Sequence, residues 1–148
     1  MILWRISDYA VLDGAGGLAY GGRWHSPRQR IVYLAPNPAA ALLERLVHIY
    51  ADADDVPASY ALHKIDAPPA LHIERIDEAR LPADWRNNLD ATRQIGDAWL
   101  ASRRTPLLEV PSALVPETWN VLMNPDMPES NGARIAAAYR AILDPRLS

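Results

Sequence analysis

Thirteen prolines distributed over 148 residues set the strongest limit on how this chain folds. Proline has a fixed φ angle and no backbone N–H, so it interrupts both helices and strand ladders. The prolines divide the chain into short elements and favour a mixed fold with many turns. No internal repeat, low-complexity tract or Gly/Ser linker is visible. The length suits one domain that covers residues 1–148.

Hydrophobic periodicity predicts the individual elements. The pattern predicts strands at 2–6, 30–34, 60–65, 71–76 and 107–110, and helices at 38–50 and 90–103. The apolar positions of the first helix extend to Tyr50, and Asn37 is placed to cap it. Ile95, Ala98 and Trp99 are expected to face inward from the second helix. We therefore expect an α+β fold with a small, twisted mixed β-sheet flanked by helices.

The segment 133–143 is ambiguous at this stage. Its alanines favour a helix by intrinsic propensity. Its large apolar residues, Ile135, Tyr139 and Ile142, are too sparse to form the apolar stripe of an amphipathic helix.

Charge and composition exclude several classes of protein. A net charge of −3 argues against a protein that coats nucleic acid, which needs clustered Lys and Arg. No stretch reaches the roughly 20 apolar residues of a membrane helix, and the apolar start meets Arg5 and Asp8 too early for a signal peptide. We expect a cytoplasmic protein with no direct role at a membrane or on nucleic acid.

The residue types also limit the chemistry. The absence of cysteine excludes disulfides, thiolate zinc sites and a cysteine nucleophile. Four arginines crowd the first thirty residues, which suits a small phosphorylated ligand, at positions Arg5, Arg23, Arg28 and Arg30.

Several well-known motifs are incomplete in this chain. The glycines of 14–17 lack the third glycine of a dinucleotide-binding loop. The four histidines lack the close spacing of a metal site, and His63 and His72 are expected on a strand surface. Neither Ser26 nor Ser112 lies in a G-x-S-x-G elbow. We expect no metal.

A series of short blocks, in order and spacing, resembles the RES-domain family. The core blocks are Gly21-Gly22-Arg23-Trp24, Ile31-Val32-Tyr33-Leu34-Ala35, Ala41-Leu42-Leu43-Glu44 and Val110-Pro111-Ser112. The flanking blocks are Trp4-Arg5, Gly96-Asp97-Ala98-Trp99, Pro116-Glu117-Thr118-Trp119-Asn120, Asn124-Pro125 and Asp144-Pro145-Arg146-Leu147. The resemblance thus spans nearly the whole chain.

The resemblance implies a fold related to ADP-ribosyltransferases and a toxin of a type II toxin–antitoxin pair. Such a toxin would act on NAD⁺ as its substrate and form a hetero-oligomer with an antitoxin that has an Xre-like helix-turn-helix domain. By matching motif positions, the implied catalytic residues are Arg23, Tyr33, Glu44 and Ser112. Arg5, Arg23, Tyr33, Ser112 and Asn120 are the implied NAD⁺-binding residues.

The residue types suit this chemistry on their own terms. Cleavage of the nicotinamide–ribose bond develops positive charge on the sugar, which a fixed carboxylate stabilises. Arginine offers a rigid fork of donors to a pyrophosphate, and a tyrosine ring can stack on nicotinamide. Taken singly, Arg23 also fits a surface arginine, Tyr33 a buried strand aromatic, Glu44 a solvated helix charge and Ser112 a turn residue.

Three alternatives for function stay open at this stage. The chain can hydrolyse or phosphorolyse NAD⁺, transfer ADP-ribose to a cellular protein, or serve as an inactive module that binds the antitoxin. The chain also departs from the family pattern at three positions. His25 stands where relatives usually have asparagine, Arg28 where they have a loop glycine, and Met127 where they commonly have histidine.

Overall fold

The computed structural model describes residues 1–51 and 56–147, without the side chains of 49–51. The predicted orientation of Tyr50 therefore lies outside the described residues. The strands are β1 (Ile2–Ile6), β2 (Val32–Leu34), β3 (Ser59–Asp66), β4 (Ile73–Arg75), β5 (Leu107–Pro111), β6 (Trp119–Met123) and β7 (Arg134–Ile142). The α-helices are α1 (Gly16–Ala19), α2 (Pro38–Ala51) and α3 (Leu89–Ser102). Short 3₁₀ helices cover Glu78–Arg80, Trp85–Asn87, Pro128–Gly132 and Pro145–Leu147.

The strands form two sheets, where the sequence analysis expected one. An antiparallel sheet has the order β1-β3-β7, and a mixed sheet has the order β2-β6-β5-β4, with β4 parallel to β5. The chain leaves β3 through Pro68-Pro69 before it enters β4 in the other sheet. Because proline cannot donate to a strand ladder, this turn ends the first sheet. A bridge between Trp4 and Ala35 connects the sheets.

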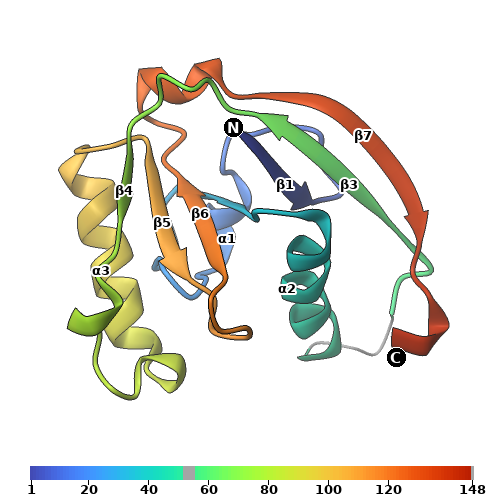
Figure 1. The fold of residues 1–148 in the computed structure, drawn as a ribbon, viewed down its shortest axis with the longest axis horizontal. Coiled ribbons are helices and arrows are strands. Elements are labelled where there is room, and N and C mark those ends of the chain that lie inside the picture. Colours follow the sequence, from blue (N-terminus) through green and yellow to red (C-terminus); the bar gives the residue numbers. More distant parts are fainter. Residues whose placement is uncertain (52–55, 148) are drawn as a thin grey trace.

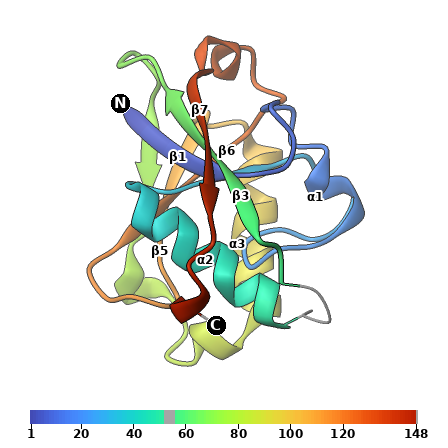
Figure 2. The ribbon, with the colours of Figure 1, turned by 90° about the vertical axis from the view of Figure 1, so that its right-hand side faces the viewer.

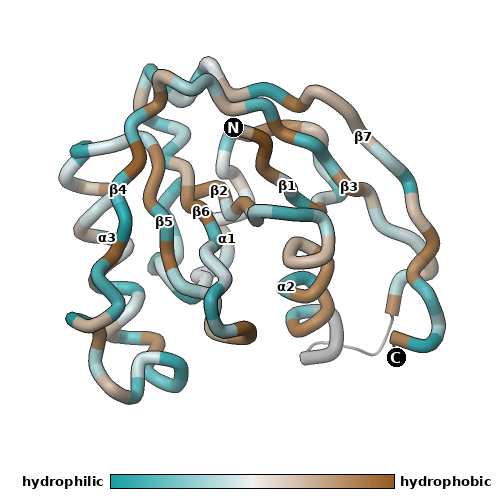
Figure 3. Tube along the Cα trace, viewed as in Figure 1, coloured by the Kyte–Doolittle hydropathy of each residue, from teal (hydrophilic) through white to brown (hydrophobic). Residues whose placement is uncertain are grey.

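The two sheets enclose one part of the core. Leu3 and Ile65 of the first sheet pack against Leu34, Leu107 and Val121 of the second. The mixed sheet buries its other face as well, because its residues also pack against α3. Burial on both faces explains the consecutive apolar residues in this sheet, Leu107-Leu108 of β5 and Val121-Leu122-Met123 of β6, and Figure 3 shows apolar colour along parts of both strands.

The helices occupy different places around the sheets (Figures 1 and 2). Helix α2 lies between the mixed sheet and the β3–β7 pair, and the predicted cap is confirmed, since Asn37 Oδ1 accepts from Ala40 N at 2.8 Å. Helix α3 covers the outer face of β4 and β5 and buries Trp99. The prediction that Ala98 faces inward was wrong: it is exposed, and Gly96 takes the inward position.

The ambiguous segment 133–143 is the strand β7. It pairs with β3 from Arg134 to Ile142, and its exposed and half-buried positions alternate over much of its length. The partner strand therefore overrides the helical propensity of the alanines. The surface assignment of His63 was also wrong, since its side chain is 3% exposed on the inner face of β3.

Candidate active site

The site is built around the carboxylate of Glu44, in the middle of α2. Its Oε1 atom accepts two hydrogen bonds, from Ser112 Oγ at 3.0 Å and from Asn120 Nδ2 at 2.9 Å. Both donors reach the same oxygen, so neither of them occupies Oε2. Glu44 is half-buried, and the two bonds hold its carboxylate in one orientation.

The donors to Glu44 come from two neighbouring strands. Ser112 follows the end of β5, and Asn120 lies near the start of β6, where it pairs with Val110. Ser112 also accepts from the backbone N–H groups of Leu114 and Val115, at 3.1 and 3.2 Å. The serine therefore fixes the β5–β6 turn and the carboxylate together.

One polar atom of the Asn120 side chain, Oδ1, makes no hydrogen bond among the described residues. Its amide nitrogen donates to Glu44, while its Oδ1 is buried with no hydrogen-bond partner among the described residues. A buried acceptor without a donor is costly unless something else supplies one. Asn120 Oδ1 is therefore an acceptor whose hydrogen bond is unmet among the described residues.

Tyr33 lies on the same sheet face as Asn120. It pairs with Leu122, and Asn120 is two residues before Leu122 on β6, so their side chains share a face. The Tyr33 hydroxyl accepts from Trp24 N at 3.1 Å and lies 2.7 Å from His25 Nδ1. Burial raises the pKa of Tyr33, so the hydroxyl keeps its proton and ties β2 to the loop that carries Arg23.

Helix α3 holds the backbone on either side of Arg23. Thr92 Oγ1 donates to the Arg23 carbonyl oxygen at 2.6 Å, and Arg93 Nε donates to the Gly22 carbonyl oxygen at 2.8 Å. Asp97 accepts from both the backbone N–H and the hydroxyl of Ser26, at 2.9 and 2.5 Å. Three side chains of one helix therefore fix the residues before, at and after Arg23.

The helix approaches this loop closely at Gly96. A Cβ atom on Gly96 would overlap the carbonyl oxygen of Trp24. Only glycine therefore lets α3 and the loop lie this close together.

The Arg23 side chain is half-buried beside Trp85. Its Nη1 donates to the Trp85 carbonyl oxygen at 3.4 Å, and its guanidinium carbon lies 6.0 Å from the centre of the Trp85 ring. Burial lowers the pKa of Arg23, while the negative charge of Glu44 opposes that shift. Arg23 is thus within electrostatic reach of Glu44.

Arg5 makes its contacts in a different place. On β1, its Nη1 donates to the Val11 carbonyl oxygen at 2.7 Å. Its pKa is lowered by burial first, with Asp13 and Arg45 as the neighbouring charges. The structure thus brings Glu44, Ser112 and Asn120 into contact, places Arg23 and Tyr33 near them, and gives Arg5 separate partners.

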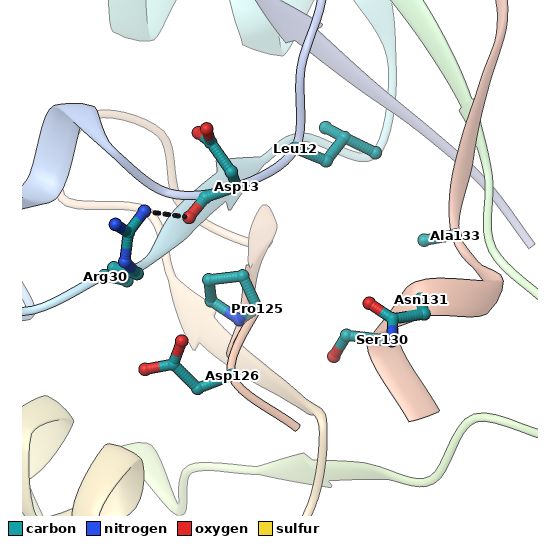
Figure 4. Close-up of a pocket in the computed structure, with 8 residues that line it drawn as sticks. All are labelled: Leu12, Asp13, Arg30, Pro125, Asp126, Ser130, Asn131 and Ala133. Carbon is teal, nitrogen blue, oxygen red and sulfur yellow. Dashed lines mark hydrogen bonds between the residues drawn. The ribbon is translucent and has the colours of Figure 1, made fainter. Parts of the chain in front are cut away.

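Two hollows lie outside this group of residues. One, of about 410 Å³, is lined among others by Asp13, Arg30 and Asp126, and Figure 4 shows Arg30 donating to the Asp13 carbonyl oxygen. The other, of about 440 Å³, is lined among others by Arg75 and Trp119. Neither is lined by Arg23, Tyr33, Glu44 or Ser112. The converging polar groups, rather than a deep hollow, define the candidate site.

Two of the departures from the family pattern differ in their local setting. Arg28 has a φ of 75°, in the left-handed region that favours glycine. Met127 is buried, at 7% exposure. In the described part of the chain, no three His, Asp or Glu side chains gather as metal ligands would, and no helix is long and apolar enough to cross a membrane.

Fold and site together define a small α+β protein in which an arginine and a hydrogen-bonded glutamate face a shared site. The RES domain model matches residues 2–144, and the chain belongs to the RES-domain toxin family. A relative from Pseudomonas putida, named Toxin Res, is 42% identical over 91% of this chain and 92% of its own. The Prs ADP-ribosylating toxin of a Sphingobium species is 34% identical over 97% of this chain and 94% of its own length.

A solved structure shares the fold. The toxin–antitoxin complex MbcT–MbcA of M. tuberculosis contains a chain that matches with a TM-score of 0.74 and 19% identity, over 95% of this chain and 84% of that one. The expected α+β class is confirmed.

Sequence reasoning missed the residues that hold the Arg23 loop, of which Thr92 and Arg93 are examples. One signal was present: a glycine in the middle of a helix indicates a close approach. Residues three and four positions before Gly96, which are Arg93 and Thr92, lie on the same side of that helix.

Proposed function

We propose that this protein is the toxin of a toxin–antitoxin pair, that residues 1–148 form one RES domain, and that it consumes cytoplasmic NAD⁺. The reaction breaks the bond between nicotinamide nitrogen and ribose C1′, and the electron pair leaves with nicotinamide. A water oxygen then bonds to C1′ and releases one proton, or phosphate takes the place of water. No metal is needed, since nicotinamide is already a good leaving group.

The orientation of Glu44 is the observation that carries the proposal. Ser112 and Asn120 hold Oε1, and Oε2 is left to face the positive charge that develops on the ribose. A charge pair about 4 Å apart at an effective dielectric of 20 is worth about 4 kcal/mol. If this interaction exists only in the transition state, it accelerates the reaction about 10³-fold.

The other site residues suit the rest of NAD⁺. Arg23 presents a guanidinium to the pyrophosphate, and the Tyr33 ring offers a surface for stacking. The unpartnered Oδ1 of Asn120 is buried, and it accepts an N–H from the nicotinamide carboxamide only if the groups that cover it move aside. Arg5 is a weaker candidate, because its guanidinium is already bound to Val11.

Transfer of ADP-ribose to a cellular protein is the second candidate. The observation that favours it is the 34% identity to a relative named as an ADP-ribosylating toxin. Both reactions share the cleavage step and differ only in the group that attacks C1′.

The proposed partner is an antitoxin with an Xre-like domain, in a hetero-oligomer. The fold likeness to a chain solved with its antitoxin supports a partner of this kind.

The test measures nicotinamide release from NAD⁺ by the purified protein, with and without phosphate, and label transfer from NAD⁺ to cell proteins. Glu44→Ala and Arg23→Ala should lose most of the release, while Glu129→Ala, at an exposed glutamate, should retain it. Phosphate dependence separates phosphorolysis from hydrolysis, and a labelled protein band indicates transfer. A folded wild-type protein with neither activity would contradict the proposal and favour the inactive antitoxin-binding module.

A further inference from the structure

His25 lies buried at the centre of the loop that carries Arg23. The residue is 2% exposed, and its ring nitrogens contact polar groups of Gly17, Gly22 and Tyr33. Nδ1 accepts from Gly22 N at 3.2 Å and lies 2.7 Å from the Tyr33 hydroxyl, and Nε2 lies 3.2 Å from the Gly17 carbonyl oxygen. The ring thus joins three segments of the chain.

These contacts select one protonation state of the ring. Because the Gly17 carbonyl oxygen can only accept, Nε2 carries the hydrogen of the neutral ring and donates to it. Nδ1 then carries no hydrogen and accepts from the Tyr33 O–H and from the Gly22 N–H, which is shared with the His25 carbonyl oxygen at 3.1 Å. Burial lowers the pKa of His25, so the neutral ring persists near neutral pH.

The glycines on either side permit this closure. A Cβ on Gly22 would overlap the Tyr33 hydroxyl, and one on Gly17 would lie 2.5 Å from the Gln29 carbonyl oxygen. The Tyr33 hydroxyl in turn accepts from Trp24 N. The backbone on both sides of Arg23 is therefore also held through His25 and Tyr33.

We propose that His25, as the neutral Nε2–H tautomer, is a positioning residue that sets the location of the Arg23 side chain for NAD⁺ binding. It touches no reacting atom and acts through the backbone of Gly22 and Trp24. The effect of His25 on the KM for NAD⁺ rests on the proposed NAD⁺ cleavage. The geometry that His25 imposes on the Arg23 loop does not depend on that activity.

Acid should disrupt this arrangement. A proton on Nδ1 would set an N–H against the donor N–H of Gly22 and would require the Tyr33 O–H to turn away. The charged groups near the ring are Asp97, which favours the proton, and Arg93, which opposes it, both on α3. The KM for NAD⁺ should therefore rise as the ring is protonated.

Two variants separate the two nitrogens. His25→Asn retains an acceptor near the Nδ1 position but cannot titrate, and His25→Gln retains a donor near the Nε2 position but removes the acceptor. We expect His25→Gln to raise the KM about tenfold, the effect of one lost hydrogen bond, and to change kcat less. His25→Asn should raise the KM less and remove the rise in acid. His72→Asn, at an exposed histidine, is the control.

Nuclear magnetic resonance tests the geometry without turnover. Imidazole ¹⁵N shifts should place the hydrogen of His25 on Nε2, and His25→Gln should speed amide exchange at Gly22 and Trp24 and broaden the Arg23 Nε–H signal. A hydrogen on Nδ1, unchanged exchange, or an unchanged Arg23 signal would each overturn the proposal. If wild type cleaves no NAD⁺, the proposed function fails while these signals still decide the role of His25. Altered exchange with an unchanged KM in an active enzyme would also overturn it.

Discussion

The two halves of the candidate site are held in different ways. Around Arg23, the backbone is bound by Thr92 and Arg93 of α3 and also by His25 and Tyr33. Glu44 is oriented by two side-chain donors on a single oxygen. The first half is a backbone held by many partners, and the second is one side chain held by few.

Because of this difference, substitutions in the two halves should change different quantities, the stability of the protein in one case and the reaction rate in the other. Changes around Arg23 should affect the free energy of unfolding and the KM more than kcat, because many bonds share the task of holding the loop. Changes around Glu44 should affect mainly the rate, because few bonds orient the charge. The following predictions test this division, from the largest effect to the smallest.

Glu44→Gln should give the largest effect, about a 10³-fold loss of kcat for nicotinamide release, equivalent to about 4 kcal/mol. The glutamine Oε1 can still accept from Ser112 and Asn120, so only the charge is lost and the melting temperature should change little. Steady-state kinetics and thermal unfolding measure both. A loss below tenfold would break the proposed role of the carboxylate.

Gly96→Ala should destabilise the protein by about 3 kcal/mol, because its Cβ overlaps the Trp24 carbonyl oxygen. Helix propensity alone predicts the opposite sign, a gain of about 1 kcal/mol. Urea unfolding measures the difference, with Gln94→Ala, an exposed position of the same helix, as the control. Unchanged stability would mean that α3 does not approach the Arg23 loop this closely.

A pair of single hydrogen-bond deletions sharpens the comparison. Thr92→Val removes the donor to the Arg23 carbonyl and should cost about 1.5 kcal/mol of stability, with nicotinamide release reduced less than threefold. Asn120→Ala removes a donor to Glu44 and should reduce kcat about tenfold, with a smaller loss of stability. Equal effects of the two changes on kcat would contradict the division between the halves.

The pH dependence of stability gives the smallest effect. Burial lowers the pKa of both His25 and His63 below the ordinary value of 6.5. Below about pH 6.5 the unfolded chain takes up protons that the folded chain does not, so stability falls as pH falls. Urea unfolding between pH 5 and 8 should show a shallower slope in His25→Asn. An unchanged slope would indicate that His25 does not contribute.

Local patterns predicted much of the fold because they depend on neighbouring residues. Hydrophobic periodicity predicted the helix over 38–50 and the strands near 2–6 and 107–110. Capping chemistry predicted that Asn37 caps the helix. The strand β7 was not predicted, because its structure depends on a partner strand rather than on its own alanines. The division into two sheets likewise depends on pairing between distant segments.

The candidate site shows the same limit. The order of the family blocks pointed to Glu44, Ser112 and Asn120, which the structure brings into contact. No local pattern showed that Thr92, Arg93 and Asp97 hold the Arg23 loop, or that His25 binds Tyr33. These contacts join positions that are far apart in the chain or lie inside a turn, where periodicity gives no signal.

The order of synthesis gives this arrangement a further consequence. Arg23 and Glu44 leave the ribosome early, but the α3 side chains that hold the Arg23 backbone and the two donors to Glu44 lie 68 to 76 residues further along the chain. At about 5–20 residues per second, some 70 residues take about 4 to 14 s to make. During that interval neither half is in its final position. A chain terminated before residue 112 therefore contains Arg23 and Glu44 but has no assembled site.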